Sequence, residues 1–561
     1  MSIKKSILVR VKIAYIFLLV IAALIVIQII NVQFVQGSQW RSRAEQIGLQ
    51  YRIKKATRGN IYTHEGVMLA TSVPLYQLSL DPTVVSDSIY ARHIDSLSKL
   101  LSVFFDDRSP LDYLRKINDA RRAKRRYIIL NNRLISYTEK EKLSQWPIFR
   151  EGQLKGGVLF EKAEDRTYPF GHLAARTIGY VNDAGRGVGI ESSFNKYLAG
   201  VNGRALYQKI AGGAWKPLRT RSEIKPVDGY DVYTTLDVNI QDLVHQALEE
   251  ALITHDANFG CAIVMEVKTG KIKAIANLGK VDNDEYRENY NYAIGPEGSS
   301  DPGSTFKIAS MMALLEDTTL NLNDSIETGN GIYRYYDRLM RDTRPGGWGK
   351  ITIQQAVELS SNIGVSKLIS FHFGKNPDEY VRYMNQFGLT TSLTSLKLAG
   401  IARPYIKNTQ DPTWSGVSLP WMSVGYELKA SPLQMLTFFN AIANEGYLIE
   451  PMLIEKVSHT GQVIEQYAPK TSKNPICSPA TMAKIKTMLE GVVERGTARN
   501  IQSKRYKIAG KTGTSQKLNE RGRYIKKYKT SFVGYFPADH PKYTCIVVID
   551  EPKGVDQYGA D

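Results

Sequence analysis

An extended apolar run lies near the N-terminus of the chain. Residues 13–27 are apolar apart from Tyr15, and no charged residue occurs between Lys12 and Arg41. At about 1.5 Å of rise per residue, roughly 20 such residues cross the hydrocarbon core of a bilayer. Basic residues precede the run and no cleavage-site pattern follows it, which predicts an uncleaved signal anchor with a cytoplasmic N-terminus. We therefore assign residues 1–35 to a cytoplasmic tail and a transmembrane helix.

The pattern of the remaining chain changes at about residue 234. Residues 36–233 mix short alternating runs with turns and charged helical stretches, which predicts a mixed α+β domain. Residues 240–252 have the apolar spacing of a helix, and residues 260–278 read as a strand pair. Strand-like runs return late in the chain, at 506–515, 530–536 and 543–550. The fold class is therefore multidomain α/β, with residues 234–561 forming a domain whose late strands complete a sheet begun early.

Length and charge narrow the class of protein. A chain of 561 residues exceeds what one hydrophobic core supports, so several domains are expected. Lys and Arg number 73 against 55 Asp and Glu, a net charge of +18 that is spread along the chain. Such an even excess is not a nucleic-acid-binding arm. It suits an anionic cell-envelope surface or a phosphate-bearing lipid, or simply a solvated basic surface.

The cysteines and histidines give no sign of a metal site. None of the three cysteines forms a Cys-x-x-Cys pair, and Cys261 and Cys545 lie in strand-like runs, where small buried side chains are expected. Whether any of them is bridged stays open at this point. The eight histidines show no metal-ligand spacing. We therefore predict no metal and no cofactor.

A candidate nucleophile follows a turn signal at residues 301–303. A helical pattern starts directly after this Asp-Pro-Gly sequence, so Ser304 falls in the first turn of a helix, and the i, i+3 spacing places Lys307 on the same face. A neutral lysine amine can take a serine proton, and a helix N-terminus favours developing negative charge. Because Ser and Lys are common residues, one Ser-x-x-Lys match is weak evidence by itself.

Two further motifs strengthen the hypothesis of a catalytic serine. Ser360-Ser361-Asn362 interrupts a helical segment, and such a break in a helix is a plausible functional position. Lys511-Thr512-Gly513-Thr514 follows a strand-like run, and the absent side chain of Gly513 would let a substrate approach the strand edge. The order Ser-x-x-Lys, Ser-x-Asn, Lys-Thr-Gly is typical of serine penicillin-recognising enzymes.

In these motifs, and over nearly its whole length, the chain resembles the class B penicillin-binding proteins, and within them the division-type septal transpeptidases. Further segments carry the resemblance: Arg58-Gly59-Asn60-Ile61, Arg166-Thr167-Tyr168-Pro169, Gly189-Ile190-Glu191, Leu236-Asp237, Ser423-Val424-Gly425-Tyr426 and Gly496-Thr497-Ala498. The resemblance implies a pedestal (dimerisation-type) domain over 36–233. It also implies a transpeptidase domain of serine β-lactamase-like fold over 234–561, with a central antiparallel sheet flanked by helices.

The resemblance also implies a role for each motif residue. Ser304 would attack the penultimate D-Ala carbonyl of a stem peptide and release the terminal D-Ala, with Lys307 as the base. Ser360 would pass a proton to the leaving amine, and Asn362 would position the substrate. Lys511 would supply positive charge. Thr512, Gly513 and Thr514 would bind substrate, the two threonines through its carboxylate, and the backbone N–H groups of Ser304 and Thr514 would form an oxyanion hole.

Partners and location follow from the same resemblance. We expect peptidoglycan stem peptides, the lipid-linked precursor and β-lactams as ligands, and no nucleic acid. A multi-spanning membrane glycan polymerase and small bitopic division proteins are the expected protein partners. The protein would cross the cytoplasmic membrane once, with its catalytic domain on the outer side. Members of the family continue with a terminal helix that packs on the sheet, so we expect that helix to be missing from a sequence that stops at Asp561.

Two other functions remain as alternatives. A β-lactam hydrolase would need a deacylation base, and no Glu-x-x-Leu-Asn motif lies between Asn362 and Lys511. A non-catalytic division scaffold or β-lactam sensor would not require the full set of motif residues, which is intact here. The basic segment 517–529 is expected to form a loop at the mouth of the site.

Overall fold

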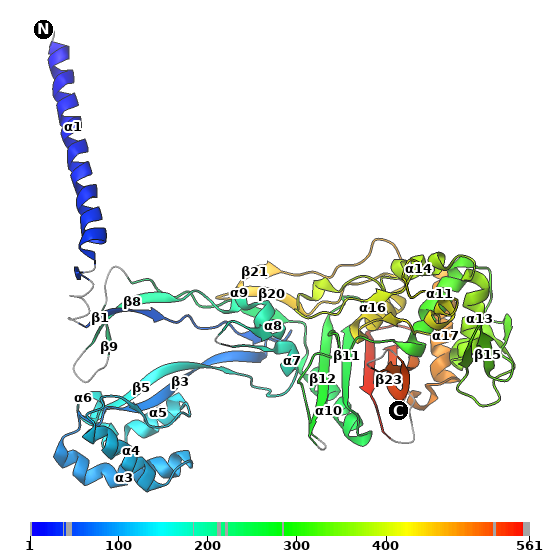
Figure 1. Cartoon of the computed structure of the whole chain (residues 1–561), viewed down its shortest axis with the longest axis horizontal. Coiled ribbons are helices and arrows are strands. Elements are labelled where there is room, and N and C mark those ends of the chain that lie inside the picture. Colours follow the sequence, from blue (N-terminus) through cyan, green and yellow to red (C-terminus); the bar gives the residue numbers. More distant parts are fainter. Residues whose placement is uncertain are drawn as a thin grey trace. The chain divides into compact units, whose positions relative to one another are not determined.

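The protein forms two compact units, each assembled from three stretches of chain. The computed structural model describes residues 3–37, 39–40, 48–182, 184–209, 215–218, 223–282, 285–519 and 523–553. The first unit comprises residues 1–58, 72–166 and 200–228, and the second comprises 59–71, 167–199 and 229–561. Figure 1 labels their helices and strands.

One helix of the described chain is long and apolar enough to cross a membrane. Helix α1 (Ile3–Ile30) continues into a π-helical turn, Asn31–Val35, and the apolar stretch Tyr15–Phe34 buries none of its surface within the protein. A helix that exposes aliphatic side chains all round has no favourable place in water. This is the span that the hydrophobic pattern predicts.

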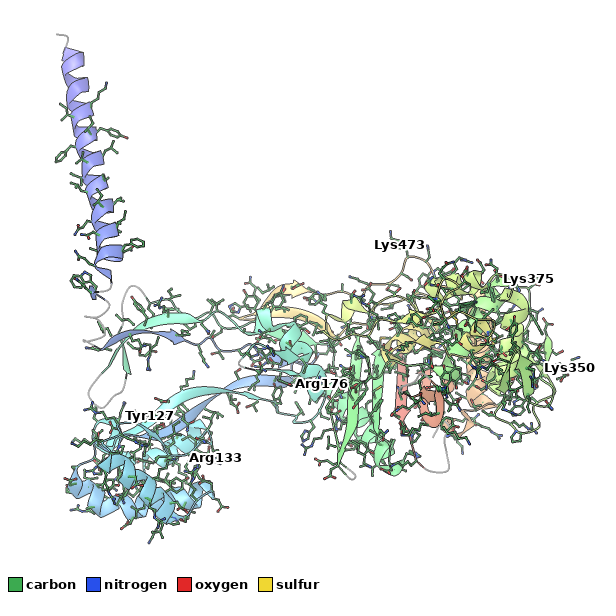
Figure 2. All side chains as sticks on the ribbon, in the orientation of Figure 1. Tyr127, Arg133, Arg176, Lys350, Lys375 and Lys473 are labelled. Carbon is green, nitrogen blue, oxygen red and sulfur yellow. The ribbon has the colours of Figure 1, made fainter. Side chains whose placement is uncertain are left out.

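The rest of the first unit has its own hydrophobic core. Helices α3 (Asp87–Phe105) and α4 (Pro110–Arg122) pack together, and Ser109 and Asp112 form a capping box that starts α4. Arg133, labelled in Figure 2, lies over the rings of Phe104 and Phe105 at 4.9 and 5.2 Å. The remaining elements are β1 (Leu49–Lys54), the later part of β3 (Met68–Leu80), β4 (Ile128–Ile129), α5 (Tyr137–Ser144), a 3₁₀ turn (Phe149–Glu151), α6 (Gly152–Gly156), β5 (Val158–Thr167), β8 (Gly203–Lys209) and β9 (Trp215–Leu218).

The second unit is organised around a six-stranded antiparallel sheet. Its strand order is β13-β12-β11-β24-β23-β22, so β11 pairs both with its sequence neighbour and with the last strand of the described chain. The fold class predicted from the sequence is therefore confirmed. The bounds are β11 (Phe259–Glu266), β12 (Ile272–Asp282), β13 (Glu285–Arg287), β22 (Ala509–Leu518), β23 (Tyr524–Phe536) and β24 (Tyr543–Asp550).

Helices cover both faces of this sheet because its central strands are apolar on both sides. Helix α10 (Val238–Thr254) begins at Asp237, whose carboxylate accepts the N–H groups of residues 239 and 240. It packs on β11 and β12, with Leu248 and Leu252 against Ala262. The neighbouring strand residue Ile263 belongs to the core on the other face, as the period of two in a strand requires.

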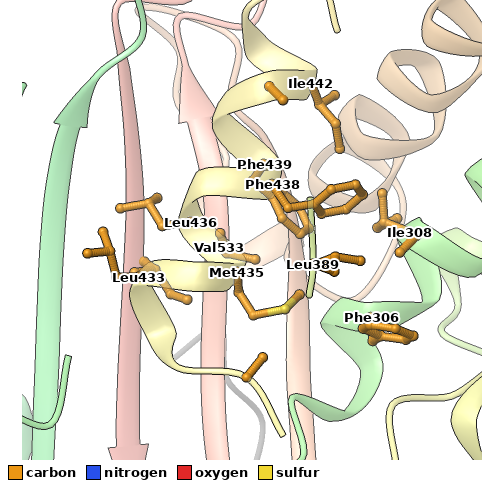
Figure 3. Packing of buried hydrophobic residues seen from close by; sticks show 14 of the residues in the cluster. Phe306, Ile308, Leu389, Leu433, Met435, Leu436, Phe438, Phe439, Ile442 and Val533 are labelled. Atoms are coloured by element: carbon orange, nitrogen blue, oxygen red, sulfur yellow. The ribbon is translucent and has the colours of Figure 1, made fainter. Parts of the chain in front are cut away.

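Helix α16 (Pro432–Ala443) is wholly buried and forms the centre of the larger core. Ser431 caps it, Pro432 starts it, and it packs on β23, β24 and β11. Figure 3 shows Phe438 and Phe439 of this helix packing with neighbouring aliphatic side chains, with Val533 of β23 nearby. Burying each phenylalanine contributes about 2–3 kcal/mol. This core supports the strands that carry the late motif.

The remaining helices and strands complete the second unit. Helix α11 (Lys307–Asp317) packs on α13 (Asn362–Phe373), α14 (Pro377–Gln386) and α17 (Pro479–Glu494), which brings the early and middle motifs onto adjacent helices. The elements are β2 (Ile61–Tyr62), α7 (Ala175–Ile178), β6 (Tyr180–Val181), β7 (Gly187–Val188), α8 (Gly189–Ser193), α9 (Asn195–Leu198), β10 (Asp231–Thr234), η3 (Gly303–Phe306), α11 (Lys307–Asp317), β14 (Ser325–Glu327), β15 (Ile332–Tyr335), β16 (Arg338–Arg341), β17 (Lys350–Thr352), α12 (Ile353–Glu358), α13 (Asn362–Phe373), α14 (Pro377–Gln386), η4 (Thr394–Leu396), β18 (Tyr405–Ile406), α15 (Ser418–Met422), β19 (Leu428–Lys429), β20 (Ile454–His459), β21 (Gln462–Gln466), α17 (Pro479–Glu494) and η5 (Arg499–Ile501).

The late strands differ from the sequence prediction in one respect. Strand β22 extends to Leu518 and β23 begins at Tyr524, so the two form a long hairpin through most of the segment expected to be a loop. Residues 524–529 read Tyr-Ile-Lys-Lys-Tyr-Lys, and the backbone pairing with the facing strand decides their conformation. Residues 554–561 lie outside the described residues, so the expectation that the terminal helix is missing stays a prediction.

Candidate active site

The three motifs line one cleft of about 530 Å³. Ser304, Ser360, Asn362, Thr512 and Thr514 all contribute to its wall. Lys307 and Lys511 lie directly behind that wall, and neither side chain has any exposed surface. A second cavity, of about 610 Å³ beside α10, is lined almost wholly by aliphatic and aromatic side chains. The polar cleft, and not the apolar cavity, therefore holds the candidate chemistry.

Ser304 lies in a 3₁₀ turn, η3, that leads directly into α11. The expectation of a helical first turn is thus nearly met, with a tighter turn at the nucleophile itself. Gly303 has a φ of +57°, and a Cβ on it would come within 2.5 Å of the Thr514 carbonyl oxygen. The glycine therefore allows the Ser-x-x-Lys turn to lie against strand β22, beside the Lys-Thr-Gly motif.

Lys307 contacts the middle motif. Its Nζ lies 2.6 Å from the Ser360 carbonyl oxygen and 3.1 Å from Ser360 Oγ. Burial lowers the pKa of Lys307 to about 7, an effect that the charge of Asp342 only partly opposes. About half of the amines are then neutral at physiological pH, which is the state that a general base requires.

Ser360 is held in an unusual backbone conformation. Its φ is +55°, in the left-handed region that costs a non-glycine residue about 1 to 3 kcal/mol. The break between α12 and α13 that the sequence suggested is this turn, and it directs both oxygen atoms of Ser360 toward Lys307. Strain of this kind persists where the surroundings fix the conformation, as they do here.

Asp342 fixes that turn, and sequence reasoning missed it. Its carboxylate accepts the Ser361 hydroxyl at 3.0 and 3.1 Å and the N–H of Ile363 at 3.0 Å. Beside it, Asn362 Nδ2 donates to the Arg341 carbonyl oxygen at 2.8 Å. An aspartate after a hairpin carries no local signal of such a role, because its partners lie about 20 residues later in the chain.

Lys511 is buried next to Lys307. Its Nζ donates to the Thr512 carbonyl oxygen at 3.0 Å, and burial together with the nearby Lys307 lowers the pKa of Lys511 well below its usual value. Two adjacent buried amines do not both hold a proton readily. By itself, Lys511 is therefore a weaker source of positive charge than the motif alone suggests.

Thr512 and Thr514 face the cleft, whereas Gly513 faces away from it. The hydroxyls of Thr512 and Thr497 lie 2.6 Å apart, so Thr497 is a further polar group at the site, from a segment noted in the sequence without a role. A Cβ on Gly513 would clash with Ser531 Oγ and approach Thr305 Cγ2. The missing side chain at Gly513 thus makes room for the turn that carries Ser304, and its role toward a substrate stays a prediction.

Aromatic side chains close the cleft on the hairpin side. Tyr524 of β23 donates a hydrogen bond to Asp301 at 3.0 Å, and its ring lies edge-on to that of Tyr426, with centroids 5.0 Å apart. Asp301 also accepts the N–H of Leu428 at 3.2 Å, and burial raises the pKa of Asp301 to about 6. The β22–β23 hairpin is therefore attached to the residue three positions before the nucleophile.

Two other findings bear on the sequence expectations. The described residues contain no group of three or more His, Cys, Asp or Glu side chains that could hold a metal ion. All three cysteines are free, which answers the question of bridging that the sequence left open. Burial raises the pKa of Cys261 and of Cys545 to about 12, so both behave as small buried side chains.

Comparison with known proteins agrees with this geometry. Residues 260–561 match the family described as penicillin binding protein transpeptidase domain, and residues 53–234 match the penicillin-binding protein dimerisation domain. The peptidoglycan D,D-transpeptidase FtsI of Buchnera aphidicola subsp. Schizaphis graminum is 28% identical over 559 residues, covering 98% of this chain and 90% of the relative. FtsI of Escherichia coli (strain K12) is 28% identical over 519 residues, covering 90% and 80%.

A solved structure supports the same fold. Penicillin binding protein 2X from Streptococcus thermophilus superposes with a TM-score of 0.73 at 22% identity, covering 91% of this chain and 78% of that protein. The resemblance inferred from the motifs is confirmed by these matches. The chain belongs to the penicillin-binding protein transpeptidases, and within them to the class B proteins of division type.

Proposed function

We propose that this protein cross-links peptidoglycan stem peptides during septal wall synthesis, as a D,D-transpeptidase that forms an acyl-enzyme at Ser304. One observation supports the assignment of these residues. The buried amine of Lys307 has a pKa of about 7 and is hydrogen-bonded to Ser360, which lines the same cleft as Ser304. These residues would supply a nucleophile, a base that is about half neutral at physiological pH and a hydroxyl relay.

The acylation step uses these groups in order. Neutral Lys307 takes the hydroxyl proton of Ser304 as the serine oxygen attacks the penultimate D-Ala carbonyl carbon. The C–N bond to the terminal D-Ala then breaks, and the departing amine receives a proton from Lys307 through the Ser360 hydroxyl, which lies 3.1 Å from Nζ. An ester on Ser304 and free D-Ala result, with no net change in protons.

The Thr512 and Thr514 side chains support recognition of the carboxylate of the terminal D-Ala. Both face the cleft, and Lys511 lies behind them with a depressed pKa. A bound carboxylate would favour protonation of Lys511, so positive charge would develop when substrate arrives. The N–H groups of Ser304 and Thr514 would hold the carbonyl oxygen, each contributing about 3 kcal/mol to transition-state stabilisation.

The second half of the reaction returns the enzyme. The amine of a second stem peptide attacks the ester carbon, gives up its proton to Lys307 and displaces Ser304, which recovers its hydroxyl proton. A new amide bond thereby joins two peptides. Asn362, whose Nδ2 donates to the Arg341 carbonyl oxygen, would hold the acyl peptide during this exchange.

The location and partners extend the proposal. A single N-terminal apolar helix is consistent with a single-pass membrane protein. Residues 234–561 would then act as the transpeptidase domain on the outer side of the cytoplasmic membrane, and residues 36–233 would form the pedestal domain. Glycan chains would come from a multi-spanning membrane polymerase acting on the lipid-linked precursor, and small bitopic division proteins would complete the assembly.

The test is intact-mass spectrometry of the full chain in detergent after incubation with a penicillin. We expect one long-lived adduct on the wild-type protein and on Ser144→Ala, a control serine on α5 of the other unit, and none on Ser304→Ala. An adduct on Ser304→Ala would refute the assignment of the nucleophile. Rapid loss of the wild-type adduct would indicate a β-lactam hydrolase, and a chain that never forms one would be a scaffold.

A further inference from the structure

The cleft contains one charged group that the proposed mechanism does not use. Among the described residues that line it, the others carry hydroxyl, amide, aromatic or aliphatic side chains, and Arg341 alone is charged. It is the last residue of β16 and is exposed to solvent. A lone guanidinium in the cleft that also holds the nucleophile favours ligands that carry an anionic group.

The backbone of Arg341 is fixed while its side chain is available. Its carbonyl oxygen accepts the Asn362 amide at 2.8 Å, and the next residue, Asp342, is bound to the turn that carries Ser360. Within the described chain, the guanidinium has no hydrogen-bond or ion-pair partner. The two nearby arginines differ, because Arg338 lies 3.4 Å from Asp337 and Arg344 covers the ring of Trp348 at 4.6 Å.

The chemistry of this position indicates a second carboxylate. A guanidinium presents parallel N–H donors that match a carboxylate in two hydrogen bonds, which a carboxamide cannot accept equally. The carboxylate of the terminal D-Ala is already assigned to Thr512 and Thr514 on β22. Arg341 lies on the opposite element, at the Ser-x-Asn turn, so the group that it binds belongs to another residue of the peptide.

We propose that Arg341 is a specificity-determining residue, which selects donor stem peptides with a free carboxylate ahead of the scissile bond over the same peptides with that carboxyl amidated. The inference rests on the proposed transpeptidase function and adds the class of its substrate. If Arg341 were only a solvated side chain that contacts no ligand, the kcat/KM values for the two peptides would be equal.

The experiment compares two synthetic pentapeptides that both end in D-Ala-D-Ala. In one, the residues ahead of D-Ala-D-Ala carry a free side carboxylate; in the other, that carboxylate is replaced by a carboxamide. Release of D-Ala is measured with the full chain in detergent, for the wild type, Arg341→Gln, Arg341→Lys and the control Arg338→Gln. We expect the wild type to favour the carboxylate peptide about tenfold in kcat/KM, the effect of one charge-assisted interaction. Arg338→Gln should keep this ratio, Arg341→Gln should bring it near one, and Arg341→Lys should retain part of it.

The outcomes separate the inference from the function on which it rests. Equal wild-type rates on the two peptides, or a ratio that survives Arg341→Gln, would overturn the role of Arg341 and leave the transpeptidase intact. A wild-type protein that releases no D-Ala and forms no adduct with penicillin would overturn both. The ratio compares two substrates on one enzyme, so a purely structural effect of the substitution would lower both rates and leave it unchanged.

Discussion

Changing the pH across the pKa of Lys307 tests the central step of the proposed mechanism. With an ordinary pKa of 10.5, only about one lysine in three thousand would be neutral at pH 7, whereas a pKa of about 7 makes half of them neutral. Burial thus raises the population of the active form by roughly a thousandfold, which corresponds to about 4 kcal/mol. The sign follows from the chemistry: the neutral amine is active, so acylation of Ser304 slows as the pH falls.

The assay is the rate of labelling by a fluorescent penicillin between pH 5.5 and 9. We expect the rate at pH 6 to be about one fifth of that at pH 7, and the rate at pH 9 to be about twice it. The carboxylate of the penicillin stays ionised throughout, so it adds no step to the profile. Because Lys307 and Lys511 are adjacent buried amines, the midpoint belongs to the pair and not to one residue.

Two variants complete this test. In Lys307→Arg the guanidinium stays protonated, so we expect labelling to fall about a thousandfold and to show no midpoint near pH 7. Lys367→Arg changes a lysine of α13 that donates to the Glu327 carbonyl oxygen, and should label like the wild type. A flat wild-type profile, or wild-type labelling of Lys307→Arg, would refute the reasoning.

Three further predictions concern the surroundings of Ser304. In Ser304→Ala, binding of a penicillin at pH 8 should take up a fraction of a proton, because the penicillin carboxylate raises the depressed pKa of Lys511. Calorimetry in two buffers of different ionisation enthalpy measures this proton uptake, and identical binding heats in the two buffers would contradict it. Tyr524→Phe removes the hydrogen bond to Asp301, so trypsin should cut the β22–β23 hairpin roughly tenfold faster, with unchanged cleavage speaking against an attached hairpin. Asp342→Ala removes the hydrogen bonds that fix the Ser-x-Asn turn, so penicillin labelling should slow about 10- to 100-fold while the circular dichroism spectrum stays close to that of the wild type. Labelling at the wild-type rate would show that the turn keeps its conformation without the Asp342 carboxylate.

Local patterns were sufficient to identify several elements. The apolar run gave the N-terminal helix, and the spacing of residues 240–252 gave α10, whose Leu248 and Leu252 are buried as the period requires. Such signals are readable because neighbours along the chain decide them. The residues of all three motifs were also named from their order alone, although their assembly into one cleft was not visible there.

The fold decided features that depend on distant contacts. The packing of the η3 turn places the open side of Gly513 against Thr305 and Ser531, a contact that no local pattern predicted. The segment 517–529 has the composition of a loop, and pairing between β22 and β23 makes most of it a hairpin. In both places the decisive neighbour lies on another element, so the residues nearby in the chain do not reveal it.

The sequence by itself determined the N-terminal apolar helix, the kind of fold and the identity of the motif residues, because periodicity and short motifs are properties of neighbouring residues. The tertiary structure alone decided the chemistry of those residues. Lys307 and Ser360 are 53 positions apart, and Asp301 and Tyr524 are 223 apart. A pKa of about 7 at Lys307 arises from removing the amine from water, and only the packed chain provides that burial.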